Sequence, residues 1–241
     1  MKYRREVDGL RAIAVLPVIL FHAGIGWFSG GFVGVDVFFV ISGYLITSII
    51  LSEKESGNFS FLKFWERRAR RILPALFLVM AVSAIPAYFL MLPDDLENFG
   101  QSLVATSLFS NNILLYLTSD YFGLEAEFKP LLHTWSLGVE EQFYIVFPFL
   151  VVGALSVIRG YLTSVLVLLA FGSFMWAEWA VANAPEAAFY LLPARAWELL
   201  LGSLAAIALR NRNGTIMWFR ERVWGGCSGW FGINYRFGGN I

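Results

Sequence analysis

The sequence predicts an all-α membrane protein, a polytopic bundle of helices. Of the 241 residues, 58% are hydrophobic and only 15% are charged, and the mean hydropathy is +0.64. A water-soluble globular protein does not reach this balance. Several apolar windows are each close to the roughly 20 residues that a helix needs to cross the hydrocarbon core. Because these windows lack the alternation of a membrane β-barrel, we expect the spanning segments to be helices.

We expect six transmembrane helices, at residues 10–28, 33–51, 73–92, 136–157, 161–181 and 196–209. Residues 1–9 are basic like the start of a signal peptide, but the apolar run that follows is too long and lacks a cleavage site, so it should remain as a span. Residues 99–117 should form a re-entrant or interfacial segment, because they contain the polar residues Ser102, Ser107, Ser110, Asn111 and Asn112. The stretch 211–241 is rich in Gly and Trp and reads as an atypical tail after a transmembrane domain of residues 1–210.

The charges in the connections predict the orientation of the chain. With residues 99–117 not crossing, the connections on one side hold Lys2, Arg4, Arg5, Lys54, Lys63, Arg67, Arg68, Arg70, Arg71, Arg159, Arg210 and Arg212. The opposite connections are acidic, with Asp94, Asp95, Glu97, Asp120, Glu125, Glu127 and Glu186 against only Lys129 and Arg195. By the positive-inside rule, we expect a multi-pass protein whose N-terminus is cytoplasmic.

The first span carries one histidine, His22, at a depth where an ionisable group is costly and usually functional. Arg11 lies eleven positions earlier, which at about 100° per residue places it on the same face, about 16 Å away along the axis. Pro17 lies between them and is expected to bend the helix. This arrangement suits an extended ligand with an anionic head and a reactive far end. The alternative is a histidine bonded to a neighbouring helix and an arginine that reaches lipid phosphate.

Several sequence blocks together resemble the membrane acyltransferase-3 family. They are "REVDGLRAIAVLPVILFH", "GGFVGVDVFFVISGYLIT", "RRARRILPAL", "LLHTWSLGVEEQFYIVFP" and "FYLLPARAWELLLGSLAA". The resemblance runs from about residue 5 to residue 210 and includes the family's Arg, ten residues, His signature at Arg11 and His22. Family domains have about ten spans, so the chain is expected to hold an incomplete, N-terminal part of one.

The resemblance implies an integral inner-membrane O-acyltransferase of bacterial polysaccharide biosynthesis. It would move an acyl group, with acetyl favoured, from acyl-CoA (acetyl-CoA) to a hydroxyl of a lipid-linked or surface glycan such as lipopolysaccharide. Membrane lipids are the other expected partners, whereas nucleic acid and metal are not expected. The single Cys227 also excludes an internal disulfide framework and a multi-cysteine metal site.

The family motif assigns the donor side of the site. His22 is expected to act as a general base, since imidazole titrates near neutral pH, or as a transient acyl-carrying nucleophile. Arg68 and Arg71, spaced i,i+3, match the family's Arg-x-x-Arg pair and are expected with Arg11 to bind the phosphates of coenzyme A. The neighbouring Arg67 and Arg70 are expected only to fix topology and attract anionic lipid.

The acceptor side is expected around the start of the fourth span. His133 and Glu140 are seven residues apart and hence on one helical face. Either Glu140 or Glu141 would be catalytic by orienting a histidine or the sugar hydroxyl, with His133, Trp135 and Tyr144 contacting the acceptor. The alternative is that these carboxylates are merely interfacial and that His133 caps the helix.

We expect mainly structural roles for the polar residues of the second and sixth predicted spans. Asp36, near the outer end of the second span, is expected to pair with a cation or to polarise a bound hydroxyl of the substrate. Ser42 and Gly43 favour close helix packing. Arg195 and Glu198, spaced i,i+3, are expected to form a mutual ion pair.

Two rival functions remain at this stage. One is a transporter of glycan or acyl groups in which His22 relays protons, although no internal symmetry of the kind common in transporters is visible. The other is an inactive fragment of an acyltransferase.

Overall fold

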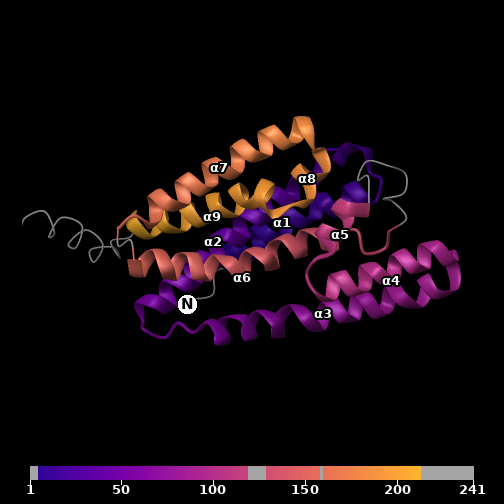
Figure 1. The fold of residues 1–241 in the computed structure, drawn as a ribbon, viewed down its shortest axis with the longest axis horizontal. Coiled ribbons are helices and arrows are strands. Elements are labelled where there is room, and N and C mark those ends of the chain that lie inside the picture. The colour runs from indigo at the N-terminus through magenta and orange to yellow at the C-terminus, as the bar shows by residue number, and fades with distance from the viewer. Residues whose placement is uncertain (1–4, 119–128, 158–159, 213–241) are drawn as a thin grey trace, which may run out of the picture.

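The protein is a bundle of helices, which confirms the predicted fold class (Figure 1). The computed structural model describes residues 5–118, 129–157 and 160–212, and no strand occurs within these ranges. The helices are α1 (Arg5–His22), α2 (Gly34–Glu55), α3 (Phe61–Leu90), α4 (Pro93–Ser107), α5 (Asn111–Thr118), α6 (Thr134–Val157), α7 (Leu162–Asn183), α8 (Pro185–Tyr190) and α9 (Leu192–Arg212), with 3₁₀ turns at Gly26–Phe28 and Gly31–Val33. Residues 213–241, most of the predicted tail, lie outside the described residues.

Five helical segments are long and apolar enough to cross a membrane. They are Gly31–Glu55, Phe61–Leu90, Thr134–Val157, Leu162–Asn183 and Pro185–Arg210. The first predicted span is shorter than expected, since its apolar helical part runs only over Gly9–His22. The five long segments contain the windows predicted for the second to sixth spans almost completely.

The first helix stops at His22 because the chain makes a glycine-dependent turn there. Gly24 has a φ of +72°, a left-handed conformation that glycine adopts without strain. The amide of Gly24 donates to the carbonyl of Phe21 at 3.0 Å, and the amide of Ile25 donates to that of Leu20 at 3.2 Å. These two bonds form a Schellman motif, a common helix end. His22 therefore occupies the last turn of α1.

Residues 99–117 form no spanning helix, as predicted from their polar side chains. Two short helices, α4 and α5, meet near Phe109, which has a φ of +53°. Gln142 of α6 donates from Nε2 to the carbonyl of Phe109 at 3.0 Å and to Asn112 Oδ1 at 2.8 Å. Asn112 in turn donates to the carbonyl of Tyr190 at 3.1 Å. These polar groups of the break are thus hydrogen-bonded inside the protein, as the membrane requires, whereas the buried Asn111 Oδ1 has no partner among the described residues.

Glycines allow α2 and α9 to cross in close contact. A Cβ atom on Gly43 would lie 1.8 Å from the carbonyl oxygen of Leu199, and one on Gly202 would lie 1.9 Å from that of Val40. In a membrane no hydrophobic driving force holds helices together, so small residues at such crossings stabilise the contact by allowing close packing. The packing role predicted for Gly43 agrees with this geometry.

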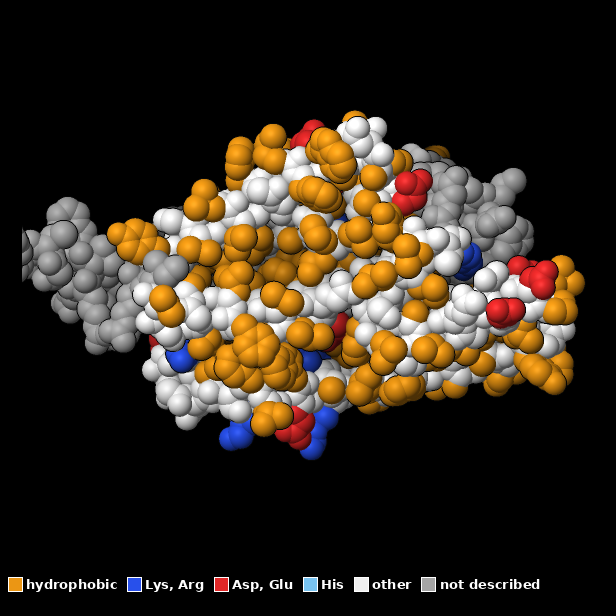
Figure 2. Space-filling model, in the orientation of Figure 1, with side chains coloured by type: hydrophobic (Ala, Val, Ile, Leu, Met, Phe, Trp, Pro, Cys, Tyr) orange, Lys and Arg blue, Asp and Glu red, His pale blue; other side chains and the backbone are white. Residues whose placement is uncertain are grey.

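Large apolar side chains remain exposed on the outer faces of the helices. Figure 2 shows hydrophobic side chains spread across the visible face, with carboxylates gathered at the end where α4 begins. On α3, for example, Leu78, Val82 and Ile85 are each about 60% exposed (64%, 59% and 64%). Such a surface suits lipid rather than water.

Candidate active site

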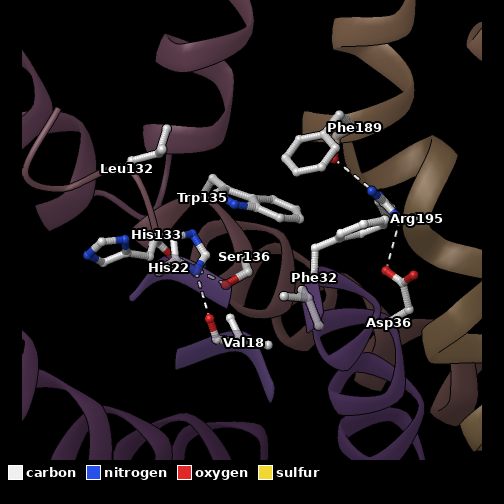
Figure 3. Close-up of a pocket in the computed structure, with 11 residues that line it drawn as sticks. Val18, His22, Phe32, Asp36, Leu132, His133, Trp135, Ser136, Phe189 and Arg195 are labelled. Carbon is white, nitrogen blue, oxygen red and sulfur yellow. Dashed lines mark hydrogen bonds and ion pairs between the residues drawn. The ribbon is translucent and has the colours of Figure 1, made fainter. Parts of the chain in front are cut away.

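The ends of four helical segments enclose a small cavity beside His22. Its volume is about 80 Å³, and its polar lining includes His22, Asp36, His133, Ser136 and Arg195. Trp135 and Phe189 form its aromatic wall (Figure 3). The cavity joins the end of α1, the start of α2, the start of α6 and the α8–α9 junction. It therefore collects residues that lie more than 170 positions apart in the chain.

The imidazole of His22 is held in a defined tautomer. Its Nδ1 atom lies 2.8 Å from the carbonyl oxygen of Val18. Because a carbonyl can only accept a hydrogen bond, we assign the ring proton to Nδ1. The Nε2 atom then keeps its lone pair. His22 is thus set up to accept a proton or an acyl group at Nε2.

A second imidazole, His133, stands against the first. The ring centroids of His22 and His133 are 5.9 Å apart in an edge-to-face arrangement. Burial, and secondarily the neighbouring His22, lower the pKa of His133 below its ordinary value. Loss of water disfavours the charged form of an imidazole, so burial favours the neutral form of His133.

Asn111 braces the segment that carries His133. Its side-chain amide donates to the carbonyl of Leu131 at 3.1 Å and to Thr134 Oγ1 at 2.8 Å. Thr134 Oγ1 donates to the same carbonyl at 2.8 Å. These bonds flank His133 on both sides, and Asn111 is only 1% exposed. The start of α6 is therefore anchored to α5.

Arg195 organises the opposite wall of the cavity. Its Nη1 atom lies 3.0 Å from Asp36 Oδ1 and 3.0 Å from Glu198 Oε1, so the ion pair expected with Glu198 also includes Asp36. Its Nε atom donates to the carbonyl of Phe189 at 3.2 Å. The guanidinium group faces the rings of Phe189 and Trp135, at 5.1 and 5.8 Å from their centroids. These contacts fix the aromatic wall relative to Asp36.

A separate polar cluster lies farther along the bundle, where α1, α3 and α6 approach one another. Arg11 and Arg68 interact electrostatically with the carboxylate of Glu140. The guanidinium group of Arg68 lies 4.7 Å from the centroid of the Tyr144 ring. Glu140 and Glu141 are 7% and 8% exposed. The cluster therefore places positive and negative groups together within the apolar bundle.

Several atoms of this inner cluster lack hydrogen-bond partners. They are Arg11 Nε, Ser42 Oγ, Glu140 Oε1 and Glu141 Oε1, all buried. The Ser42 hydroxyl lies near Glu140 but completes no hydrogen bond of good geometry. Unsatisfied buried polar groups are costly and call for an explanation such as a bound polar ligand or water. The inner cluster is thus chemically ready for a polar ligand.

The four arginines at the start of α3 divide into two pairs. Arg67 forms an ion pair with Glu53 at 2.6 Å, and Arg70 forms one with Glu66 at 2.7 Å. Within the described part of the chain, Arg68 and Arg71 form no ion pair. This division parallels the expected roles, in which only Arg68 and Arg71 bind an anionic ligand.

The predicted site residues thus separate into two groups. His22, Asp36, His133 and Trp135 line the cavity, whereas Arg11, Arg68, Glu140 and Tyr144 belong to the inner cluster, with Glu141 and Arg71 in electrostatic contact with it. Glu140 and Tyr144, which were predicted to act beside His133, do not line the cavity that contains His133. Because α6 begins at Thr134, its first residues line the cavity while Glu140 and Tyr144 lie one to three turns deeper.

Sequence reasoning gave no role in the site to Asn111 and only a structural one to Arg195. A buried amide in an otherwise apolar window was the available signal for Asn111. Within the described residues, no group of three His, Cys, Asp or Glu side chains is placed to hold a metal ion.

Comparisons with known proteins agree with the resemblance of the sequence blocks. A family model described as "Acyltransferase domain" matches residues 4–237. The "Peptidoglycan O-acetyltransferase OatA" of Listeria monocytogenes is 36% identical over 211 residues, which cover 85% of this chain and 34% of the relative. The "Putative peptidoglycan O-acetyltransferase YrhL" of Bacillus subtilis is 39% identical over 213 residues, covering 86% and 33%. The matches span about a quarter to a third of the curated relatives. No solved structure matches.

Proposed function

The chain belongs to the acyltransferase-3 family, and from this premise we propose that it is a membrane O-acyltransferase that moves an acetyl group from acetyl-CoA to a glycan hydroxyl. The observation that carries the proposal is the position of Arg11 and His22 on α1. Arg11 lies in the inner cluster and His22 lies in the cavity. Eleven residues of helix separate them by about 16 Å. An extended donor with its phosphates at one end and its thioester at the other fits this separation.

The inner cluster has the chemistry to hold the donor. Arg68 and Arg71 are free of ion pairs within the described ranges, and Arg binds phosphate oxygens through several parallel hydrogen bonds. The unsatisfied acceptors Ser42 Oγ and Glu140 Oε1 lie near Arg11 and Arg68. They are available to the amide and hydroxyl groups in the arm of coenzyme A. Glu140 and Glu141 therefore belong to the donor side of the site in this proposal.

The cavity has the chemistry to receive a sugar. The Trp135 ring offers an apolar face for stacking, and Asp36 keeps a carboxylate oxygen available to a hydroxyl. Peptidoglycan is the substrate named for two of the relatives. We therefore take a cell-wall glycan, rather than the lipopolysaccharide suggested by the sequence blocks, as the acceptor. His22 serves as the reacting imidazole, either as the base for this hydroxyl or as an acyl carrier.

The orientation of the chain follows from the same proposal. The donor end must face the cytoplasm, where acetyl-CoA is made, so the N-terminus and the α2–α3 turn are cytoplasmic. This can be tested in a Cys227→Ser background with single cysteines at Ser56 and at Leu92. A membrane-impermeant thiol reagent added to whole cells should label the cysteine at residue 92 and spare that at residue 56. The reverse pattern would contradict the orientation.

The decisive experiment measures acetyl transfer directly. Membranes containing the protein are incubated with acetyl-labelled acetyl-CoA and a lipid-linked peptidoglycan precursor, with wild type and His22→Ala compared at equal amounts of inserted protein. We expect label on the glycan with wild type only. Movement of glycan across the membrane without any acetylation would instead support the transporter.

A further inference from the structure

The cavity holds two imidazoles, and one base is enough to deprotonate a hydroxyl. His22 comes from α1 and His133 comes from the segment just before α6, yet their ring centroids are 5.9 Å apart. Both line the same cavity (Figure 3). Each ring is held by its own support, His22 by the carbonyl of Val18 and the His133 segment by Asn111. Such independent anchoring of two titratable rings suggests two separate tasks.

We propose that His133 is the base that deprotonates the acceptor hydroxyl while His22 holds the acyl group. The inference rests on the proposed function, and it decides between the two roles left open for His22. A single imidazole cannot carry an acyl group on Nε2 and take up a proton on the same atom. A second imidazole within about 6 Å removes this conflict.

The first step is the transfer of the acyl group to His22. The Nε2 lone pair attacks the thioester carbonyl, the carbon–sulfur bond breaks, and its electron pair leaves with sulfur. The thiolate takes a proton from solvent and departs as free coenzyme A. The Nδ1–H group stays hydrogen-bonded to the Val18 carbonyl, which stabilises the positive charge of the acylated ring.

The second step passes the acyl group to the acceptor. His133 takes the hydroxyl proton as the oxygen–carbon bond forms. The carbon–Nε2 bond then breaks and its electron pair returns to Nε2, which restores neutral His22. His133 then releases its proton to solvent. This proton replaces the one that the thiolate of coenzyme A took from solvent in the first step.

The assignment of the two roles follows from the surroundings of each ring. His22 shares α1 with Arg11, which contacts the donor side of the site. Burial, and secondarily His22, lower the pKa of His133 and so favour its neutral form. The other charged groups that line the cavity are Asp36 and Arg195, which are paired with each other at 3.0 Å. Asp36 would stabilise the imidazolium that His133 becomes, and Arg195 opposes that effect.

The two steps can be separated by measuring release of coenzyme A. Full-length protein in detergent is mixed with acetyl-CoA, first without acceptor and then with a peptidoglycan disaccharide, and free thiol is followed in time. We expect wild type and His133→Gln to release about one equivalent of coenzyme A in a rapid first phase. Transfer to the disaccharide should fall about 10²- to 10⁴-fold in His133→Gln, the usual loss for a general base.

Two further variants complete the design. His22→Gln should show no first phase, because it has no nucleophilic nitrogen. Asn183→Ala should behave as wild type, since the hydrogen bond that the Asn183 side chain makes among the described residues goes to the carbonyl of Trp179 in its own helix. The inference would be wrong if His133→Gln transferred acetyl at the wild-type rate, or if well-folded His133→Gln lost both the first phase and the transfer. Either result would leave the proposed function intact. Absence of transfer by wild type would contradict the proposed function itself.

Discussion

Arg195 of α9 lies 3.0 Å from the Asp36 carboxylate of α2, although 159 residues separate them in the chain. The same Nη1 atom contacts Glu198, whose side chain is only 2% exposed. One guanidinium group thus forms ion pairs with two carboxylates at the edge of the cavity. A carboxylate left without this partner in a low-dielectric environment would be strongly unfavourable.

We predict that Arg195→Met destabilises the protein and abolishes acetyl transfer. Removing one partner of a buried ion pair typically costs about 3–5 kcal/mol, because the other charge stays buried and unpaired. Thermal unfolding of the purified protein in detergent measures this effect. The matched control is Arg70→Met, whose ion pair with Glu66 is exposed (side chains 79% and 56% exposed). A surface pair contributes about 0–1 kcal/mol, so an equal loss in both variants would contradict the prediction.

We predict that Gly43→Ala prevents normal packing of α2 on α9. The new methyl group would lie 1.8 Å from the carbonyl oxygen of Leu199, and backbone cannot move aside without separating the helices. Overpacking typically costs about 1–3 kcal/mol. The yield of monodisperse protein after size-exclusion chromatography reports the damage. Gly172→Ala in α7 is the control, because nothing lies within 4 Å of its new Cβ atom. Normal yield of Gly43→Ala would refute this account of the crossing.

The spans and the non-crossing segment were predictable because they depend on local composition. Residues 99–117 contain buried asparagines that no lipid-facing helix tolerates, so their failure to cross could be foreseen. The early end of α1 was missed, although its signal, the glycines from Gly24 onward, is visible in the sequence. Hydropathy averaged over a window of residues gives no sign of the left-handed turn that a single glycine permits.

The grouping of the site was less predictable because it depends on how helices pack. A spacing of seven residues places His133 and Glu140 on one helical face only if both residues lie in the helix. In the structure α6 begins at Thr134, so His133 lies just before the helix. Likewise, the contact between Arg195 and Asp36 requires the close crossing of α2 and α9. No local pattern specifies which distant carboxylate an arginine will reach.

We predict that Arg68→Ala and Arg71→Ala raise KM for acetyl-CoA with a smaller effect on kcat. Phosphate contacts remote from the thioester stabilise the bound donor and the transition state alike. Steady-state kinetics at varied acetyl-CoA concentration separate the two parameters. Arg67→Ala and Arg70→Ala are the controls, since these arginines are paired with Glu53 and Glu66. A fall in kcat at unchanged KM would argue against donor binding.

We predict that Asn111→Leu impairs catalysis more than stability. Leucine shares the branching of asparagine at Cγ but cannot donate to the carbonyl of Leu131 or to Thr134 Oγ1, so the segment with His133 loses its anchor. Asn111→Gln retains a donor and should recover part of kcat. The rate of acetyl transfer is compared with the melting temperature of each variant. Equal activity of Asn111→Leu and Asn111→Gln would show that the hydrogen bonds do not position the site.

The last prediction concerns the pH dependence of acetyl transfer. A base acts in its neutral form, which is populated above its pKa, and the pKa of His133 is lowered from the ordinary value of 6.5. The midpoint of the acidic decline in rate should therefore lie below pH 6.5. The charged groups that line the cavity with His133 are His22, Asp36 and Arg195. The initial rate at saturating acetyl-CoA, measured over about pH 5 to 8, gives the profile.

His133→Gln provides the comparison for this profile. Glutamine does not titrate, so the low residual rate should lose the acidic decline that we predict for wild type. If the decline persists unchanged in His133→Gln, another group titrates in the rate-limiting step. If the wild-type decline is centred above pH 6.5, the group that titrates is not His133 with a pKa lowered by burial and by His22.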